Sequence, residues 1–381
     1  MADPMNSVVI HLICSSGFYG AERVVANLIQ AFPEFQMQVL CMARESSDLT
    51  TFMAQVRKSP TSKFQRIGNK LLPALKELRS LQRNNPTMII HAHGYKEILV
   101  ATLFKLLFRT PVIVTQHGFT NRNFKSKVYN WIDKACCRWG GVDTLIAVSE
   151  QSAAIYQQFG VADNKIIVLH NGIASGEKLN SASLKKAFTS QQGIPADNQL
   201  ILFAGRLSAE KDPILFVKAI AAMRRNNSQI TGIIAGDGPL SSQVRDTIRT
   251  LHLESHVKCL GFVSNIDQLI PAASILMLTS QSEGIPMVML EAMAAGTPVV
   301  AAAVGGIPTV MTSGYNGVLV DSRQPEDFAA KALELLANEE TRLQLIRNGI
   351  TTIHEGYSLK SQQATYHSIY QTGSRQEPLR W

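Results

Sequence analysis

Apolar and polar positions alternate along this chain in a pattern typical of α/β proteins. Short apolar runs, bounded by turn residues, recur from end to end, and helical stretches separate them. A strand that is covered by helices on both faces has a continuous apolar sequence. The pattern therefore predicts a parallel sheet in each half. With 381 residues the chain is long enough for two domains. The polar stretch 174–197 separates them, and we place the domains at 1–180 and 190–358.

Two glutamates eight residues apart mark the most informative segment. Glu283 and Glu291 follow the apolar run 275–278, which we expect to be a buried strand. Gly284 and Pro286 then predict a turn into a helix, because proline suits the first helical position. Glu283 then lies at the mouth of this helix and Glu291 about two turns inside it. At ~1.5 Å per residue Glu291 is roughly 12 Å further on, a separation that fits a nucleotide-sugar. An ordinary strand–turn–helix with two solvated acids is the alternative.

Polar residues also follow neighbouring apolar runs. Arg206 and Lys211 come after the run 200–203, and open α/β sheets bind ligands at the carboxyl ends of their strands. A guanidinium fork and an ammonium suit a diphosphate that is held from two sides. Glycine, which lacks a Cβ, allows the backbone to approach a ligand. Two further runs end in glycine-containing turns, Gly236-Asp237-Gly238-Pro239 and 304–308.

Four motifs follow one another here: G-R-L-x-x-E-K from Gly205, G-D-G-P from Gly236, E-x7-E from Glu283, and E-A-M-A-x-G-x-P-V-V from Glu291. In order and spacing they resemble the retaining glycosyltransferases of family 4, which have the GT-B fold. The resemblance implies two Rossmann-like, doubly wound parallel-sheet domains facing a central cleft, with a C-terminal helix (359–381) packed back on the first. It also implies transfer of a sugar from a nucleotide-diphosphate sugar to a hydroxyl, with retention at the anomeric carbon.

The same resemblance assigns roles in the second, donor-binding domain. Arg206 and Lys211 would neutralise the departing diphosphate in place of a metal ion, so we expect neither a metal nor another cofactor. Glu283 would bind hydroxyls of the donor sugar, and Glu291 would bind the ribose diol. Further residues expected around the donor are Gly236, Asp237, Gly238, Pro239, Gly284, Ile285 and Pro286.

Two positions depart from the family pattern. Asp212 follows the lysine of the basic loop, where the family usually has glycine. Thr309 stands where the family often has an acid. Neither departure touches the arginine, lysine or glutamate positions, so they bear on donor selectivity and not on the class of reaction.

The first half resembles the family through shorter segments. The turn after the apolar run 8–14 contains Gly17 and Gly20 and is similar to a G-G-A-E loop, with Tyr19 where a second glycine often stands. Gly20 would let backbone N–H groups approach the donor phosphate or the acceptor, and a tight strand–helix turn is the alternative. In a T-x-H-G segment, His117 would lie beside the donor sugar and position it without covalent chemistry.

A His-x-His pair, His91 and His93, lies at another predicted strand end. Alternation puts both side chains on one face of a strand, where they could in principle bind a metal. No carboxylate or cysteine lies nearby in the sequence to complete a ligand set. We therefore expect no metal site.

Cysteine usage and hydropathy favour the cytoplasm. The five cysteines form no C-x-x-C pair and leave an odd number, which favours a reducing compartment over a disulfide framework. The first apolar run has no basic segment before it and is too short for a signal peptide. No segment approaches the ~18 consecutive apolar residues of a spanning helix. We expect a soluble or peripheral protein.

Charge is distributed unevenly. Residues 1–190 carry 22 Lys and Arg against 12 Asp and Glu, whereas residues 191–381 carry 15 against 17. The stretch 69–83 interleaves leucine with bases at helical spacing, and 122–131 adds aromatics. Such a face is typical of proteins that bind an anionic membrane surface, and a solvated helix face is the alternative. We expect a peripheral enzyme at the inner face of a bacterial membrane, extending a lipid-linked surface polysaccharide or lipopolysaccharide.

Three other functions compete with this one. A small soluble acceptor would make no use of a basic face. Nucleic-acid binding would use the same charge, but the sequence contains no recognisable DNA- or RNA-binding motif, so we expect no nucleic-acid partner. A sugar phosphorylase needs a cofactor lysine in a much longer chain, and nucleotide-sugar epimerases lack this combination of motifs.

Overall fold

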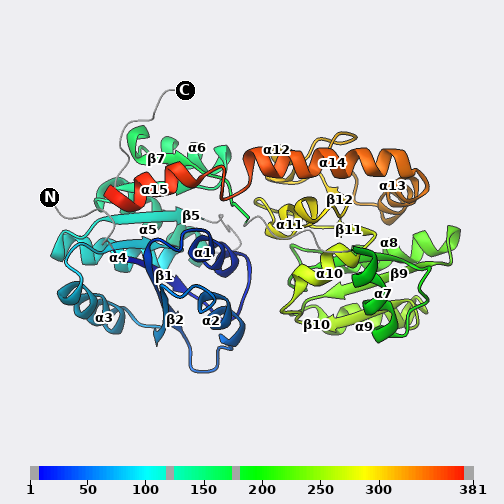
Figure 1. Ribbon diagram of the computed structural model, residues 1–381, viewed down its shortest axis with the longest axis horizontal. Coiled ribbons are helices and arrows are strands. Elements are labelled where there is room, and N and C mark those ends of the chain that lie inside the picture. The colour runs from blue at the N-terminus through cyan, green and yellow to red at the C-terminus, as the bar shows by residue number, and fades with distance from the viewer. Residues whose placement is uncertain (1–7, 117–123, 174–180, 373–381) are drawn as a thin grey trace. The chain divides into compact units, whose positions relative to one another are not determined.

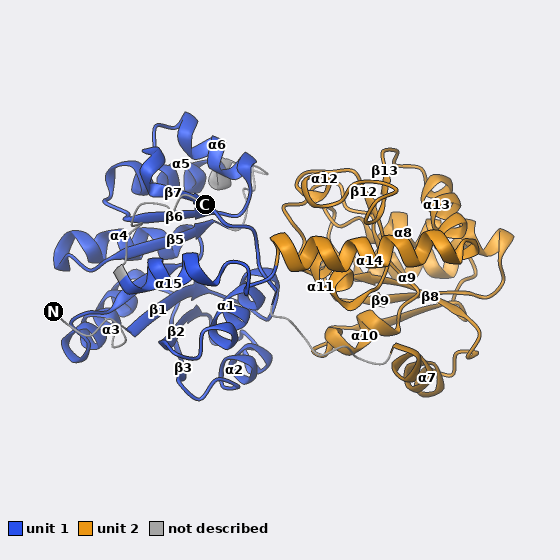
Figure 2. Ribbon diagram, turned by 45° about the horizontal axis from the view of Figure 1, so that its top comes forward, with its two compact units in different colours: residues 1–174, 358–381 blue, residues 175–357 orange. Residues whose placement is uncertain are grey.

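The chain divides into two compact units, each built on its own parallel sheet (Figures 1 and 2). The computed structural model describes residues 8–116, 124–173 and 181–372. Unit 1 comprises residues 1–174 and 358–381, and unit 2 comprises residues 175–357. The sheets have seven and six strands, which confirms the predicted α/β class with two parallel sheets.

The sheet of unit 1 has the strand order β3-β2-β1-β4-β5-β6-β7. Its strands are β1 (Val8–Cys14), β2 (Gln36–Ala43), β3 (Ser62–Gly68), β4 (Ile89–Ala92), β5 (Val112–Gln116), β6 (Thr144–Ala147) and β7 (Ile166–Val168). Its helices are α1 (Gly20–Ala31), α2 (Thr50–Val56), α3 (Leu71–Asn84), α4 (Tyr95–Phe108), α5 (Phe124–Trp139), α6 (Glu150–Gln158), the short 3₁₀ helix η2 (Asp163–Lys165) and α15 (Gln363–Thr372).

Helices cover both faces of this sheet, which explains the continuous apolar runs of its strands. On one face, α3, α4 and α6 bury Leu78, Phe104 and Tyr156 in a single core with the strands. On the other face lie α1, α2 and α15 (Figure 1), where Phe64 of β3 meets Phe52 of α2 with ring centroids 5.3 Å apart.

The C-terminal segment packs within unit 1. Its helix α15 begins at Gln363, so the predicted start at residue 359 was too early. The amide of Leu359 instead donates to the carbonyl of Ile173 (3.0 Å), and Ser358 forms a β-bridge with the same residue. Residues 359–362 then form turns, and the helix starts after them.

The sheet of unit 2 has the order β10-β9-β8-β11-β12-β13. Its strands are β8 (Gln199–Ala204), β9 (Ile230–Ala235), β10 (Val257–Gly261), β11 (Ile275–Leu278), β12 (Val299–Ala302) and β13 (Val318–Val320). Its helices are α7 (Ser181–Gln192), α8 (Pro213–Asn226), α9 (Ser241–Thr250), α10 (Ile266–Ala272), α11 (Met287–Ala295), α12 (Ile307–Val310), α13 (Pro325–Ala337) and α14 (Glu339–Gly356).

Candidate functional site

The strand order of unit 2 creates a natural ligand site between β8 and β11. The chain continues from β8 toward β9 on one side and from β11 toward β12 on the other. The two loops therefore diverge at the carboxyl ends of these strands, where doubly wound sheets bind their ligands. The loop after β8 carries Arg206 and Lys211, and the loop after β11 carries Glu283. The topology thus brings three predicted site residues to one edge of the sheet.

Lys211 and Glu283 form an ion pair at this edge. The Lys211 Nζ lies 2.6 Å and 2.7 Å from the two carboxylate oxygens of Glu283, and Ser280 Oγ donates to the same carboxylate at 2.6 Å. The Glu283 side chain is only 6% exposed, whereas that of Lys211 is 28% exposed. An ammonium has three N–H donors, so two contacts with one carboxylate still leave a donor for an anion from solvent.

The two glutamates lie before and within helix α11, as the sequence predicted, but the helix begins one residue later than expected. Helix α11 begins at Met287, and Pro286 is its N-cap with an extended backbone (φ −69°, ψ 125°). Glu283 therefore lies in the loop before α11, and only Glu291 lies in the helix. Residues 283–286 are not helical, so helical rise applies only to the part of the segment from Met287 onward. Glu291 is half-buried, Gly284 is exposed, and the side chains of Ile285 and Pro286 are buried.

Backbone contacts join the motif loops of unit 2 to one another. The amide of Leu207 donates to the carbonyl of Asp237 (3.0 Å), and the amide of Gly306 donates to the carbonyl of Glu283 (3.2 Å). A Cβ added at Gly236 would lie 1.9 Å from the Gly205 carbonyl oxygen. Gly236 is thus required for the packing of the G-D-G-P turn against the loop of Gly205. The sequence had suggested only that this glycine lets the backbone approach a ligand.

Arg206 and Asp237, two other predicted site residues, differ in whether their side chains are engaged in the protein. Arg206 has an exposed side chain. Asp237 accepts hydrogen bonds from the Ser241 hydroxyl and from the Gly238 N–H (2.7 Å), and these bonds lower the pKa of its carboxyl group. Pro239 follows in the same exposed turn. Arg206 is therefore accessible to a ligand, whereas the Asp237 side chain stabilises the turn that leads into α9.

In unit 1 the corresponding crossover lies between β1 and β4, and the Gly17–Gly20 loop leaves β1 there. Ser15 Oγ donates to the Gly17 carbonyl (2.7 Å), and Glu22 closes a capping box by accepting from the Tyr19 N–H (3.0 Å). Gly20 is the first residue of α1. These contacts form a tight strand–helix turn. His117 lies outside the described residues.

The histidine pair belongs to a buried cluster of three. His11 of β1 is paired in register with His91 of β4, and the Nδ1 of His11 lies 3.0 Å from the Nε2 of His93. All three rings are buried, and one nitrogen of each lies within 4.8 Å of the others. The third histidine was missed because its partners lie some eighty residues away, and only a correct strand pairing could have found it.

Hydrogen bonds occupy both nitrogens of His91, which contact the Tyr370 hydroxyl (3.0 Å) and Thr115 Oγ1 (2.7 Å). Binding a metal through either nitrogen would break one of these bonds. Burial lowers the pKa of His11 to about 3, so this ring is neutral near pH 7. The cluster is thus a hydrogen-bonded part of the core that attaches α15 to the sheet.

Two buried carboxyl groups lie elsewhere in unit 1. Burial raises the pKa of Glu97 to about 7, and its carboxylate accepts the Cys14 N–H. Burial likewise raises the pKa of Asp133 to about 6, where Tyr156 and Gln116 donate to it at 2.6 Å and 2.8 Å. These groups ionise near neutral pH inside the core, so the stability of unit 1 must depend on pH.

Most of the basic segment 69–83 lies in α3, where some leucines are buried and others are exposed to solvent. Leu78 is buried, whereas Leu72 is 76% exposed. Arg79 is held over the ring of Phe108 at 4.2 Å. Exposed side chains elsewhere in unit 1 include Leu106, Leu107, Trp131 and Trp139. Among the described residues, no helix combines the length and apolarity that crossing a membrane requires.

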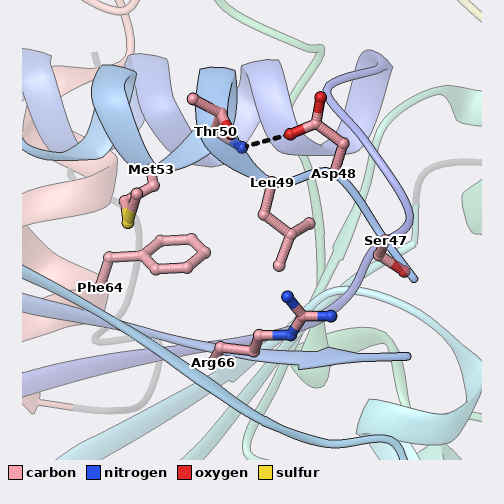
Figure 3. A pocket seen from close by; sticks show the side chains of 7 residues that line it. All are labelled: Ser47, Asp48, Leu49, Thr50, Met53, Phe64 and Arg66. Carbon is pink, nitrogen blue, oxygen red and sulfur yellow. Dashed lines mark hydrogen bonds between the residues drawn. The ribbon is translucent and has the colours of Figure 1, made fainter. Parts of the chain in front are cut away.

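A pocket of about 250 Å³ opens between α2 and β3 in unit 1 (Figure 3). Phe64 and Arg66 come from the strand, and Met53 comes from the helix. The remaining lining residues are Ser47, Asp48, Leu49 and Thr50. None of the residues predicted from the motifs lines this pocket, so it belongs to a different part of the surface.

Comparison with known proteins agrees with this geometry. The model for glycosyl transferases group 1 matches residues 185–352, and the model for glycosyltransferase family 4 matches residues 18–176. The chain belongs to glycosyltransferase family 4. Both units of the structure are thus matched by models of this family, and the chain is a glycosyltransferase.

Two relatives of this glycosyltransferase differ in their acceptors. It is 23% identical over 355 residues to the Escherichia coli UDP-Gal:alpha-D-GlcNAc-diphosphoundecaprenol alpha-1,3-galactosyltransferase. The aligned region covers 89% of this chain and 90% of that relative. It is 30% identical over 277 residues to the D-inositol 3-phosphate glycosyltransferase of Corynebacterium glutamicum, with 68% and 66% covered. Among solved structures, Anabaena HepE in complex with UDP and glucose has a TM-score of 0.81 at 22% identity and covers 94% of this chain and 98% of its own. That likeness supports the GT-B fold.

Proposed function

We propose that this glycosyltransferase transfers a sugar from a nucleotide-diphosphate donor to a hydroxyl with retention at the anomeric carbon. The observation that carries the proposal is the Lys211–Glu283 pair at the β8–β11 crossover, next to the exposed Arg206. Two cations and one carboxylate at a strand edge suit a ligand with a diphosphate at one end and sugar hydroxyls at the other.

In this proposal the two cations stabilise the leaving group. Arg206 and Lys211 would neutralise the negative charge that grows on the diphosphate as the glycosidic bond breaks, an electrostatic task suited to fixed cations. Because these side chains supply that charge, no divalent metal is required. The N-terminus of α11, with Gly284, Ile285 and Pro286 leading into it, offers backbone N–H groups to the same diphosphate.

In the same proposal, two glutamates and the glycine-containing turns bind the sugar and the ribose of the donor. Glu283 would accept hydrogen bonds from hydroxyls of the donor sugar, and Glu291 would accept them from the ribose diol. The G-D-G-P turn would line the donor site through its backbone. His117, from the first unit, would position the sugar without bonding to it covalently, and the Gly17–Gly20 loop would approach the phosphate or the acceptor.

A donor screen tests this proposal. The purified protein is incubated with UDP-, GDP-, dTDP- and ADP-sugars, and released nucleotide is measured. HepE was solved with UDP and glucose, so UDP-glucose and UDP-galactose come first. Proton NMR of the glycoside formed with an acceptor then assigns its anomeric configuration: retention is expected, and an inverted glycoside would refute the proposed mechanism.

For the acceptor we propose a lipid-linked glycan at an anionic membrane surface. The relative that acts on a diphosphoundecaprenol-linked sugar supports it, as does the excess of ten positive charges in residues 1–190. Exposed Leu72 and Trp131 lie in unit 1, which contains most of these bases. An apolar side chain can enter the interface while nearby bases attract anionic lipids.

A small soluble acceptor is the second candidate, and one observation favours it. The relative at 30% identity is named for inositol 3-phosphate, a small anionic molecule. A basic acceptor unit would also attract such an anion. Transfer assays with a short lipid-linked disaccharide and with inositol 3-phosphate separate the two: only the true acceptor will raise nucleotide release above slow hydrolysis.

A further inference from the structure

Asp212 has a backbone conformation that is uncommon for residues with a side chain. Its φ is +46° and its ψ is 61°, in the left-handed region, where glycine is the usual residue. The Asp212 side chain forms bonds that a glycine could not provide. Its Oδ1 accepts the Leu215 N–H (3.1 Å) and thereby caps α8, and its Oδ2 accepts from Arg323 at 2.6 Å.

Arg323, the partner of the Asp212 carboxylate, comes from a loop that is distant in the sequence. It lies between β13 and α13, and its guanidinium also donates to the carbonyls of Thr279 (2.8 Å) and Ser280 (2.7 Å). A guanidinium can hold several acceptors in one plane, which a lysine ammonium cannot do with the same geometry. Arg323 therefore joins the residue after Lys211 to the strand end that precedes Glu283.

Other contacts place the same two loops side by side. Thr279 Oγ1 donates to the carbonyls of Lys211 (3.2 Å) and Asp212 (2.9 Å), and the Gln281 N–H donates to the Glu210 carbonyl (2.7 Å). The Asp212–Arg323 bond is the ion pair within this set, with side chains 21% and 36% exposed. It therefore connects three loops at the carboxyl edge of unit 2.

We infer that Asp212 and Arg323 are positioning residues that hold the loop of Lys211 against the loop of Glu283. The inference rests on the proposed function, because it gives these two residues their role at the donor. The pair itself touches neither the diphosphate nor the sugar in this account. It fixes the placement of a cation and a carboxylate that bind adjacent parts of one ligand, the diphosphate and the sugar attached to it. A misplacement of about 1 Å can cost a hundredfold in rate.

The first test measures the position of Lys211 without any donor. Wild type, Arg323→Met and Asp212→Gly are treated with an amine-acetylating reagent, and acetylation of Lys211 is followed by peptide mass spectrometry relative to the exposed Lys218. Asp212→Gly suits its positive φ, so folding is not at risk from the backbone. We expect several-fold faster acetylation of Lys211 in both variants. The control is Arg225→Met, which breaks an exposed ion pair with Glu326 in the same unit.

The second test measures catalysis with UDP-glucose, or with whichever nucleotide sugar the wild type hydrolyses. We expect kcat to fall about tenfold to a hundredfold in Arg323→Met and Asp212→Gly, with the larger change in kcat than in KM. Asp212→Asn keeps the helix cap and loses the charge, so it should restore part of the rate. Combining Arg323→Met with Asp212→Gly should cost little more than either change alone.

These results separate the inference from the proposed function. Lys211 acetylation equal to that of Arg225→Met would overturn the positioning role, as would faster acetylation with unchanged kcat. A wild type that hydrolyses no nucleotide sugar would instead refute the proposed function, while the acetylation rates would still show whether the pair holds Lys211.

Discussion

The two units share a strand order around their central crossover, but the ionisable groups at the two crossovers differ in exposure and in their partners. In unit 2 the crossover carries an ion pair that is partly open to solvent, between Lys211 and Glu283. In unit 1 the strands at the crossover carry His11 and His91, which are fully buried and hydrogen-bonded to His93 and Tyr370. The same scaffold can therefore keep charges available for an anionic ligand or bury neutral groups that hold a helix in place.

The largest expected effect concerns the charges of unit 2. Lys211→Ala should lower kcat for the donor about a hundredfold to a thousandfold, since one preorganised donor contributes ~3 kcal/mol to transition-state stabilisation. Steady-state kinetics of nucleotide release measure it. Lys218→Ala, an exposed lysine of α8, is the matched control and should behave as wild type. Unchanged turnover in Lys211→Ala would refute the proposed role of this cation.

A buried carboxyl in unit 1 should give the next effect. The pKa of Glu97 is raised to about 7 from 4.5, so its stabilising contribution is complete below pH 4.5 and is lost as the pH rises through 7. Glu97→Gln keeps an acceptor for the Cys14 N–H and removes this dependence. Relative to wild type, the variant should gain about 3 kcal/mol in free energy of unfolding between pH 4.5 and 7.5.

Urea unfolding at several pH values measures this gain, with the exposed Glu45→Gln as the control. If Glu97→Gln and wild type keep the same difference in stability across this range, Glu97 does not ionise in the folded core.

His11 should act in the opposite direction. Its pKa is lowered to about 3 from 6.5, so the folded state loses stability as the pH falls below 6.5. The loss reaches about 2 kcal/mol at pH 5. In His11→Gln this part of the acid dependence should disappear, whereas the exposed His354→Gln should keep it. An acid titration of stability that is identical in His11→Gln and wild type would contradict the buried neutral ring.

The smallest effect per residue concerns the surface charge of unit 1. Each base near an anionic surface adds ~1 kcal/mol of attraction, so reversing Lys70, Lys76 and Arg83 together should abolish co-sedimentation with anionic vesicles. Arg79 is left intact because it packs on Phe108. Salt should weaken wild-type binding through screening.

The control for this experiment reverses three exposed bases of unit 2, Lys218, Arg249 and Lys331. These reversals should leave vesicle binding unchanged. A wild-type protein that ignores anionic vesicles at low salt would refute the membrane proposal and favour the soluble acceptor.

Local sequence patterns predict many of the strands and helices of this protein. Runs such as 8–14 and 275–278 predicted strands because helices on both faces require continuous apolar residues, and the structure confirms both. The start of α11 was wrong because a proline fits an N-cap as well as a first helical turn. His11 and Arg323 were missed for another reason: their partners lie 82 and 111 residues away, and no local pattern encodes such contacts.

We propose that Arg206 and Lys211 replace a metal ion at the donor diphosphate. Nucleotide release from the UDP-, GDP-, dTDP- and ADP-sugars, measured with and without EDTA, tests it most directly. We predict that one donor is hydrolysed at the same rate in both conditions and that Lys211→Ala loses this activity. Abolition of wild-type activity by EDTA would refute the proposed role of these two cations.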